Sequence, residues 1–326
     1  MRMPTRHTPP ETTPGYRPAP PLVYAARLEA GLNTLLAEAP GDPATAGLFG
    51  PGSQLWRLNR ESLVFLGAAR ALLLQLADPR VAAGVAAHSV ALDDPLGRFH
   101  RTFGTVYPMV FGTAEQAFAA AGRLHRRHGA VTGRLSDGAP YAANEPDALA
   151  WVQATLADSA AIAWDLVLPP PTPAERDAYW GESRRFARLF GLDPADLPAD
   201  WAGFQAWTAA RLDGPGLAVT PEARRVADAL FRRGPLTLRP PRWYLALTAR
   251  LLPPRLADGF GLPTGAADLA RADRALALIR RAYPALPATL RFVGPWHEAQ
   301  ARLAGRAGPG PVTRSLNRLW IGRDRL

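Results

Sequence analysis

Residues 113–129 read Thr-Ala-Glu-Gln-Ala-Phe-Ala-Ala-Ala-Gly-Arg-Leu-His-Arg-Arg-His-Gly, and this stretch decides the fold class. Thr113 followed by Gln116 is the capping-box pattern, in which two side chains satisfy backbone N–H groups at the start of a helix. An alanine-rich run follows, and Gly129 is a residue type that commonly ends helices. The stretch therefore predicts one capped helix.

The same punctuation recurs along the chain. Residues 172–175 (Thr-Pro-Ala-Glu) start a second such helix, which ends before Gly191. Residues 220–221 (Thr-Pro) start a third, which closes at Gly234. Helical periodicity predicts further helices over residues 22–37, 62–77, 147–166, 199–212, 242–251 and 266–282.

Alternating, strand-like patterns are rare. Residues 237–238 and 290–293 are too short to build a sheet, so we predict an all-α protein. A stiff run at residues 168–173 (Leu-Pro-Pro-Pro-Thr-Pro) is compatible with a domain boundary or with a loop between helices. We favour one compact multi-helix domain over residues 22–305, preceded by a disordered arm (residues 1–21) and followed by a loosely ordered tail (residues 306–326).

Composition narrows the functional classes. The 326 residues contain no cysteine, which excludes disulfides, thiolate metal sites and cysteine nucleophiles. All 38 basic residues are arginine, which excludes a lysine Schiff base and a P-loop lysine. The net charge is +10, but the arginines alternate with acidic residues along the chain, which argues against nucleic-acid binding. Neither a signal peptide nor a transmembrane run is evident, and we expect a cytoplasmic protein.

Two histidines lie near the end of the capped helix, in Arg123-Leu-His-Arg-Arg-His128. At about 100° per residue, His128 falls on one stripe with Ala117, Ala121 and Leu124, and His125 lies about 60° away. An imidazole on a face lined by alanines suits an axial haem ligand. Two other interpretations stay open at this point, a buried structural histidine and a zinc site built from His125 and His128.

The preceding segment carries a second pattern. Helical spacing places Arg98, Thr102 and Thr105 on one face, and Phe99, Phe103, Val106 and Val110 on another. Arginine and threonine one turn apart can bind a carboxylate such as a haem propionate, and a solvated helix face is the alternative. Neither a nucleotide-binding glycine loop nor a hydrolase or metalloprotease motif is found.

An ordered set of motifs resembles the MpaB-type oxygenase family, which includes the catalytic domain of rubber oxygenase, the latex clearing protein. The resemblance spans roughly residues 55–265. The motifs are Leu55-Trp-Arg-Leu-Asn-Arg60, Ala71-Leu-Leu-Leu-Gln-Leu-Ala77, Val81-Ala-Ala-Gly-Val85 with His88-Ser89, Gly97-Arg-Phe-His-Arg-Thr102, Phe111-Gly-Thr113, His128 with Val131-Thr-Gly133, Pro140-Tyr-Ala-Ala-Asn144, Leu149-Ala-Trp-Val152, Tyr179-Trp-Gly-Glu-Ser183 and Leu251-Leu-Pro-Pro254.

The resemblance implies a helical fold that encloses non-covalent haem b. It implies that His128 is the proximal iron ligand, with His125 or His88 as the alternatives, and that Arg98 and Thr102 lie near the haem. Arg101 occupies the position of a distal lysine in rubber oxygenase, and an arginine stays protonated and does not ligate iron.

Two family histidines are replaced, by Asp78 and by Gln153. We therefore expect a haem-b oxygenase that combines dioxygen with an apolar substrate, isoprenoid or lipid-like, with cleavage of a carbon–carbon double bond as the expected reaction. The alternatives are a haem-binding sensor or carrier without turnover, and an arginine-rich helical protein that binds nucleic acid or anionic membranes.

Overall fold

The computed structural model describes residues 21–88, 94–231 and 239–326. Its first part contains helices and one 3-10 turn, in the order α1 (Pro21–Ala37), α2 (Gln54–Asn59), η1 (Ser62–Gly67), α3 (Ala68–Ala77), α4 (Pro79–His88), α5 (Pro95–Phe111) and α6 (Ala114–Gly129).

The middle part begins with a short hairpin and continues as helices: β1 (Thr132–Arg134), β2 (Pro140–Ala142), α7 (Pro146–Val167), α8 (Pro173–Ala187), η3 (Arg188–Phe190), η4 (Pro194–Asp196), α9 (Trp201–Asp213) and α10 (Pro221–Phe231). The last part is helical throughout: α11 (Arg242–Arg250), α12 (Pro254–Gly259), α13 (Ala266–Ala282), η6 (Tyr283–Ala285), α14 (Ala288–Arg291), α15 (Gly294–Leu303) and α16 (Pro311–Ile321).

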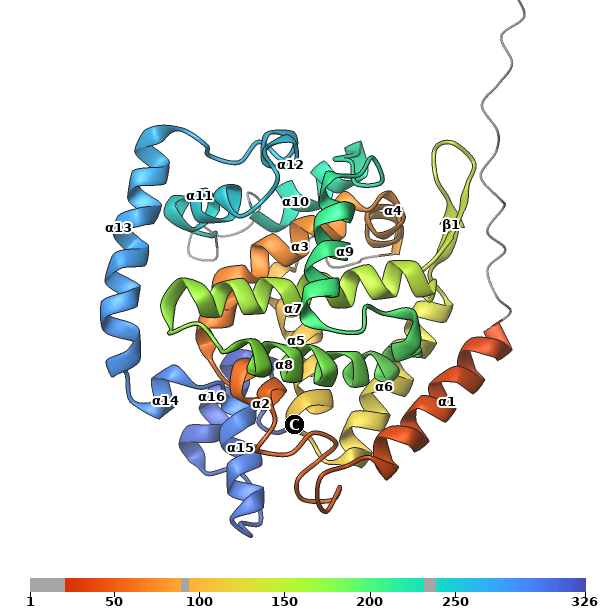
Figure 1. Cartoon of the computed structure of the whole chain (residues 1–326), viewed down its shortest axis with the longest axis vertical. Coiled ribbons are helices and arrows are strands. Elements are labelled where there is room, and N and C mark those ends of the chain that lie inside the picture. Colours follow the sequence, from red (N-terminus) through yellow and green to blue (C-terminus); the bar gives the residue numbers. More distant parts are fainter. Residues whose placement is uncertain (1–20, 89–93, 232–238) are drawn as a thin grey trace, which may run out of the picture.

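Helix α7 is the centre of the fold. It crosses the middle of the molecule and contacts η1, α3, α8 and α13, so it is buried on most of its faces (Figure 1). A helix surrounded in this way needs apolar residues on all sides, and Ala154, Ala161 and Trp151 are among its buried residues. Segment η1 approaches α7 so closely that a Cβ on Gly67 would lie 2.3 Å from the Ser159 carbonyl oxygen.

The capped helices form as predicted. Thr113 and Gln116 make both hydrogen bonds of the capping box at α6, and Thr172 and Glu175 do the same at α8. The mostly helical fold is therefore confirmed for the residues that the structure describes. The expected helix over residues 62–77 is divided, because the chain forms a 3-10 segment up to Gly67 before α3 begins.

Other expectations need correction or fall outside the described ranges. The tail does not lie loosely, because residues 311–321 form α16, which packs against α15 and α5 and buries Asn317 and Ile321. The short antiparallel pair of β1 and β2 was not expected. Residues 1–20 of the predicted arm, Gly234 and residues 237–238 lie outside the described part of the chain.

Buried ion pairs join distant segments. Arg70, only 3 % exposed, pairs with Asp158 at 2.7 Å and so ties α3 to α7. Glu61 is fully buried and accepts two hydrogen bonds from Arg291 and one from Tyr283. Such fork-like pairs suit the guanidinium geometry, so many of the arginines are structural.

Among the described residues, no single helix is long and apolar enough to cross a bilayer. One pair of helices, Ser62–Ala77 with Pro79–Ala87, has the length and composition for a span but is bent by 97°.

Candidate active site

Helices α5 and α6 form the scaffold of the candidate site. A single residue, Gly112, separates the end of α5 from the Thr113 cap of α6, and the two helices pack against each other. Two helices that pack against each other across such a short loop form a helical hairpin. The start of α5, with Arg98 and Thr102, therefore lies toward the same end of the pair as the finish of α6, with His125 and His128.

His128 is a neutral, largely desolvated imidazole. Its side chain is half-buried near the end of α6, and burial, with smaller contributions from His125 and Arg127, lowers its pKa to about 4. Burial also lowers the pKa of His125. At neutral pH the His128 ring therefore carries a nitrogen lone pair that can ligate a metal.

The zinc interpretation finds no support in the described residues. Nowhere in them do three His, Cys, Asp or Glu side chains come together as a metal site, so His125 and His128 have no third protein ligand there. A haem needs only one axial imidazole from this helix, and the neutral His128 fits that requirement. The side chain of His88, the other alternative, is outside the described part of the structure.

The alanine stripe of α6 does not border open space. Ala117 and Ala121 are fully buried and belong to the main hydrophobic core. Helix α6 contacts α1 and η3 as well as α5, and these elements take up the room that small side chains leave. The sequence shows which residues share this face of the helix. Whether another helix or a ligand covers the face depends on tertiary packing.

The three predicted residues of α5 lie in different environments. Arg98 is half-buried, and burial, followed by the positive charge of Arg101, lowers its pKa. Arg101 is exposed and pairs with Asp94 at 3.3 Å. Thr102 is exposed and is the one of the three that lines a cavity. Asp94 also accepts a hydrogen bond from the Gly97 N–H, which starts the helix.

That cavity lies against the apolar face of α5, about a quarter-turn from the face of Arg98 and Thr105, and between α5, α7, η1, α3, α2 and α8. The hollow measures about 780 Å³ when its open, solvent-filled part is included, and the centre of a water-sized molecule can occupy about 90 Å³ of it. Thr102 stands at its rim because it is both exposed and part of the lining. The α5 wall continues with apolar side chains and one tyrosine: Phe103, Val106, Tyr107 and Val110.

Neither Arg98, Arg101, His125 nor His128 contributes to the lining of this cavity. The structure therefore brings Thr102 and the apolar face of α5 to the cavity, and leaves the histidines at the neighbouring end of α6. The apolar face itself, Phe103, Val106 and Val110, is the one that helical spacing predicted.

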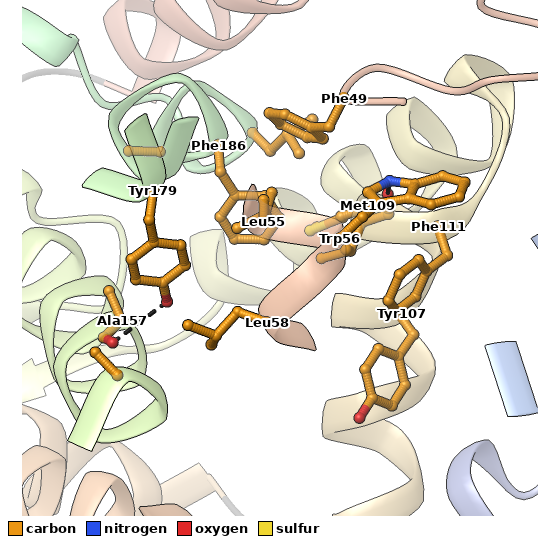
Figure 2. Close-up of a cluster of buried hydrophobic side chains, with 14 of the residues drawn as sticks. Phe49, Leu55, Trp56, Leu58, Tyr107, Met109, Phe111, Ala157, Tyr179 and Phe186 are labelled. Atoms are coloured by element: carbon orange, nitrogen blue, oxygen red, sulfur yellow. Dashed lines mark hydrogen bonds between the residues drawn. The ribbon is translucent and has the colours of Figure 1, made fainter. Parts of the chain in front are cut away.

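Three buried polar atoms of residues that line the cavity are unpaired within the described structure. They are the Tyr107 hydroxyl, the Gln153 Oε1 and the Ser183 hydroxyl. Burial raises the pKa of Tyr107, so its hydroxyl keeps its proton. Figure 2 shows this hydroxyl directed away from the Trp56 and Phe111 rings. Buried polar atoms without partners are uncommon in native proteins, and these three indicate where a ligand would supply hydrogen bonds.

Sequence reasoning missed Tyr107 and noted Gln153 only as a departure from the family. A usable indication was present for Tyr107, because it follows Phe103 by one helical turn on the predicted apolar face. Gln153 lies in α7, most of whose buried residues are apolar, and a polar residue at a buried position of such a helix is a candidate for a functional role.

Asp78, the second departure, has a structural role. It is 2 % exposed and forms ion pairs with Arg80 at 2.7 Å and with Arg211 at 3.3 Å. Arg211 also stacks over the Trp151 ring, 5.1 Å from its centroid. This network joins the turn between α3 and α4 to α9, away from the cavity lining.

The sequence comparison agrees with the motif pattern. Residues 56–281, more than two-thirds of the chain, match the family model described as "ER-bound oxygenase mpaB/B'/Rubber oxygenase, catalytic domain". Neither a curated protein nor a solved structure matches the chain significantly. The matched region extends from α2 to the end of α13 and contains all the candidate site residues and, except for Leu55, the residues that line the cavity.

Proposed function

Because the chain belongs to the family of mpaB and rubber oxygenase catalytic domains, we propose that it is a haem-b-dependent oxygenase that acts on an apolar substrate of isoprenoid or lipid-like type. The observation that carries this proposal is the largely apolar cavity along α5, the helix that precedes α6 and its His128, in the region of the family match. The reaction proposed is oxidative cleavage of a carbon–carbon double bond by dioxygen.

His128 is the residue proposed to hold the iron. Its pKa of about 4 keeps the imidazole neutral and able to ligate across the neutral pH range. Arg98 is proposed to bind a haem carboxylate, since its partly buried guanidinium can make a charge-assisted hydrogen bond, and Thr102 to hydrogen-bond at the cavity rim. When bound, haem b supplies the activation of dioxygen.

The protein supplies orientation and exclusion of water. The side chains of α5, α7 and η1 present an apolar surface, which favours a hydrocarbon substrate by about 25 cal/mol for each Å² buried. A chain lying in the cavity passes Thr102 at the rim, where its reacting double bond is proposed to lie. Arg101 keeps a positive charge near this rim while Asp94 holds its side chain.

Dioxygen uptake tests the proposal. Purified protein that contains haem is mixed with a short isoprenoid alkene under air, and carbonyl products are measured against the oxygen consumed. The expected result is carbonyl product that depends on both dioxygen and haem. Haem-containing protein that consumes no oxygen with any isoprenoid or unsaturated lipid would instead identify a sensor or carrier. Salt-sensitive nucleic-acid binding without haem would identify the arginine-rich binding protein.

A further inference from the structure

Gln153 presents a hydrogen-bond acceptor to the cavity. The side chain is 3 % exposed, and its Nε2 donates to the Ser183 carbonyl oxygen at 2.9 Å. This bond fixes the orientation of the amide, because the opposite orientation would set two oxygens against each other. The Oε1 atom is left in the cavity wall, buried, and it has no partner within the described structure.

The Gln153 end of the cavity is the deep end. The lining of α5 runs from Thr102 to Val110, about 12 Å at the helical rise per residue. At the Val110 end, the carbonyl oxygen accepts from Trp56 Nε1 at 2.7 Å, which places α2 there. Leu55, which directly precedes Trp56, donates its N–H to the Glu182 carboxylate at 2.6 Å.

Glu182 precedes Ser183, the residue that holds the Gln153 amide. Helices α2, α7 and α8 therefore meet at this end, and Figure 2 shows Tyr179 and Phe186 of α8 on the side of Leu55. Thr102 lies at the other, exposed end. The cavity is thus a largely apolar channel, with the Gln153 Oε1 and the Ser183 hydroxyl in its wall at this end.

We propose that this cavity binds an apolar chain that carries one terminal hydroxyl group, with the O–H donating to Gln153 Oε1 and the chain extending along α5 toward Thr102. The inference rests on the proposed function only in taking this ligand to be the substrate. The substrate class is then an unsaturated, isoprenoid-like alcohol, and the hydroxyl sets which double bond reaches the rim.

The chemistry of the acceptor excludes related ligands. A hydrocarbon leaves Oε1 unpaired, and an ether or ketone has no proton to donate to it. A carboxylate places a negative charge against an oxygen. The buried cation nearest the lining, Arg70, is already paired with Asp158 and bonded to Ser159. The hydroxyl of Ser183, at the same end, can turn to donate to the ligand oxygen.

Calorimetric binding of decan-1-ol and 1-methoxydecane to the purified protein tests the inference. The two probes have similar apolar chains and differ in the donor proton. We expect the alcohol to bind about tenfold more tightly than the ether, as one net hydrogen bond gives. Equal affinities in the wild-type protein overturn the inference, and this comparison needs no variant.

Variants then locate the acceptor. In Gln153→Met, which keeps the length of the side chain, the affinity for the alcohol should fall to the affinity for the ether. Thr208→Val is the control, because the Thr208 Oγ1 is also buried and unpaired in the described structure but lies outside the cavity lining. It should keep the tenfold preference. A preference that survives Gln153→Met and is lost in Tyr107→Phe contradicts the proposal and transfers the ligand oxygen to Tyr107.

Haem content, measured in the same samples, separates the two proposals. Protein that contains haem and does not distinguish the probes contradicts the hydroxyl site alone. Protein that takes up no haem and still prefers the alcohol contradicts the oxygenase proposal and leaves the binding site standing.

Discussion

At the scale of single residues, Arg98 is the side chain whose role depends most on burial. It is half-buried near the start of α5, and burial lowers its pKa, as expected for a cation held away from water. If it binds a haem carboxylate, Arg98→Ala should weaken haem affinity about ten- to a hundred-fold in a haem titration, because a charge-assisted bond of roughly 1.5–3 kcal/mol is lost.

The control for this prediction is Arg126→Ala. Arg126 is exposed on α6, so its removal should leave the titration unchanged. If Arg98→Ala and Arg126→Ala both bind haem like the wild type, Arg98 makes no contact with the haem.

His128 gives a second prediction at this scale, a pH dependence of stability. Its folded pKa, about 4, lies below the ordinary value of 6.5, so the unfolded chain binds a proton first as the pH falls. Stability from this group is present above pH 6.5 and is lost between 6.5 and about 4. In haem-free protein, the melting temperature of His128→Asn should therefore fall less steeply with decreasing pH over this range than the melting temperature of the wild type. Parallel curves would contradict the burial of His128.

Individual residues also show what sequence can predict. Thr113 and Thr172 have local partners three residues away, so their caps were predictable and are confirmed. The Tyr107 hydroxyl and the Gln153 Oε1 were not predictable in this way. Whether these atoms find a hydrogen-bond partner depends on which helices surround them. Gln153 lies in the interior of α7, so no local signal marks its environment. The cavity that it lines depends on the packing of α5 and α8 against α7.

At the scale of elements, the contact between η1 and α7 shapes the cavity. Gly67, Ala68 and Ser159 all line it, and a Cβ on Gly67 would meet the Ser159 carbonyl at 2.3 Å. Gly67→Ala should therefore lower the free energy of unfolding by about 1–3 kcal/mol, as overpacked sites do, in urea denaturation.

Gly181 provides the matched glycine. It lies within α8 with no atom within 4 Å of the added Cβ, so Gly181→Ala should raise the free energy of unfolding by about 0.5–1 kcal/mol. Equal effects of the two substitutions would show that η1 does not approach α7 as described.

Element boundaries were predictable where punctuation is local. The predicted limits of α13, residues 266–282, agree with the structure because the pattern of buried positions continues without a break. The 3-10 geometry of η1 was not predictable, since the helical pattern over residues 62–77 continues across Gly67 and the close approach to α7 is a tertiary constraint.

At the scale of the whole molecule, the C-terminal helices complete the fold. Trp320 of α16 stacks on Phe65 of η1 at 4.6 Å between ring centroids, and Phe65 lines the cavity. The final residue, Leu326, donates its N–H to Glu298 at 3.0 Å and accepts from Gln116 at 3.2 Å. The sequence analysis expects residues 306–326 to be loosely ordered, and these contacts hold them against the rest of the fold.

Removal of residues 306–326 should therefore destabilise the whole chain. The truncated protein loses the Trp320 stack and leaves the buried Glu298 without its Asn317 partner. We expect the free energy of unfolding to fall by about 2–4 kcal/mol, which would lower the melting temperature in differential scanning calorimetry by several degrees. A melting temperature equal to that of the full chain would show that the tail is dispensable.

The haem content of three proteins tests the central claim most directly. In a pyridine haemochrome assay after expression with haem supply, the wild type and His125→Ala should each contain about one protohaem per chain, because one axial histidine holds one haem. His128→Ala should contain almost none, with its circular dichroism unchanged. Wild-type protein without haem, or His128→Ala with full haem content, would contradict the account.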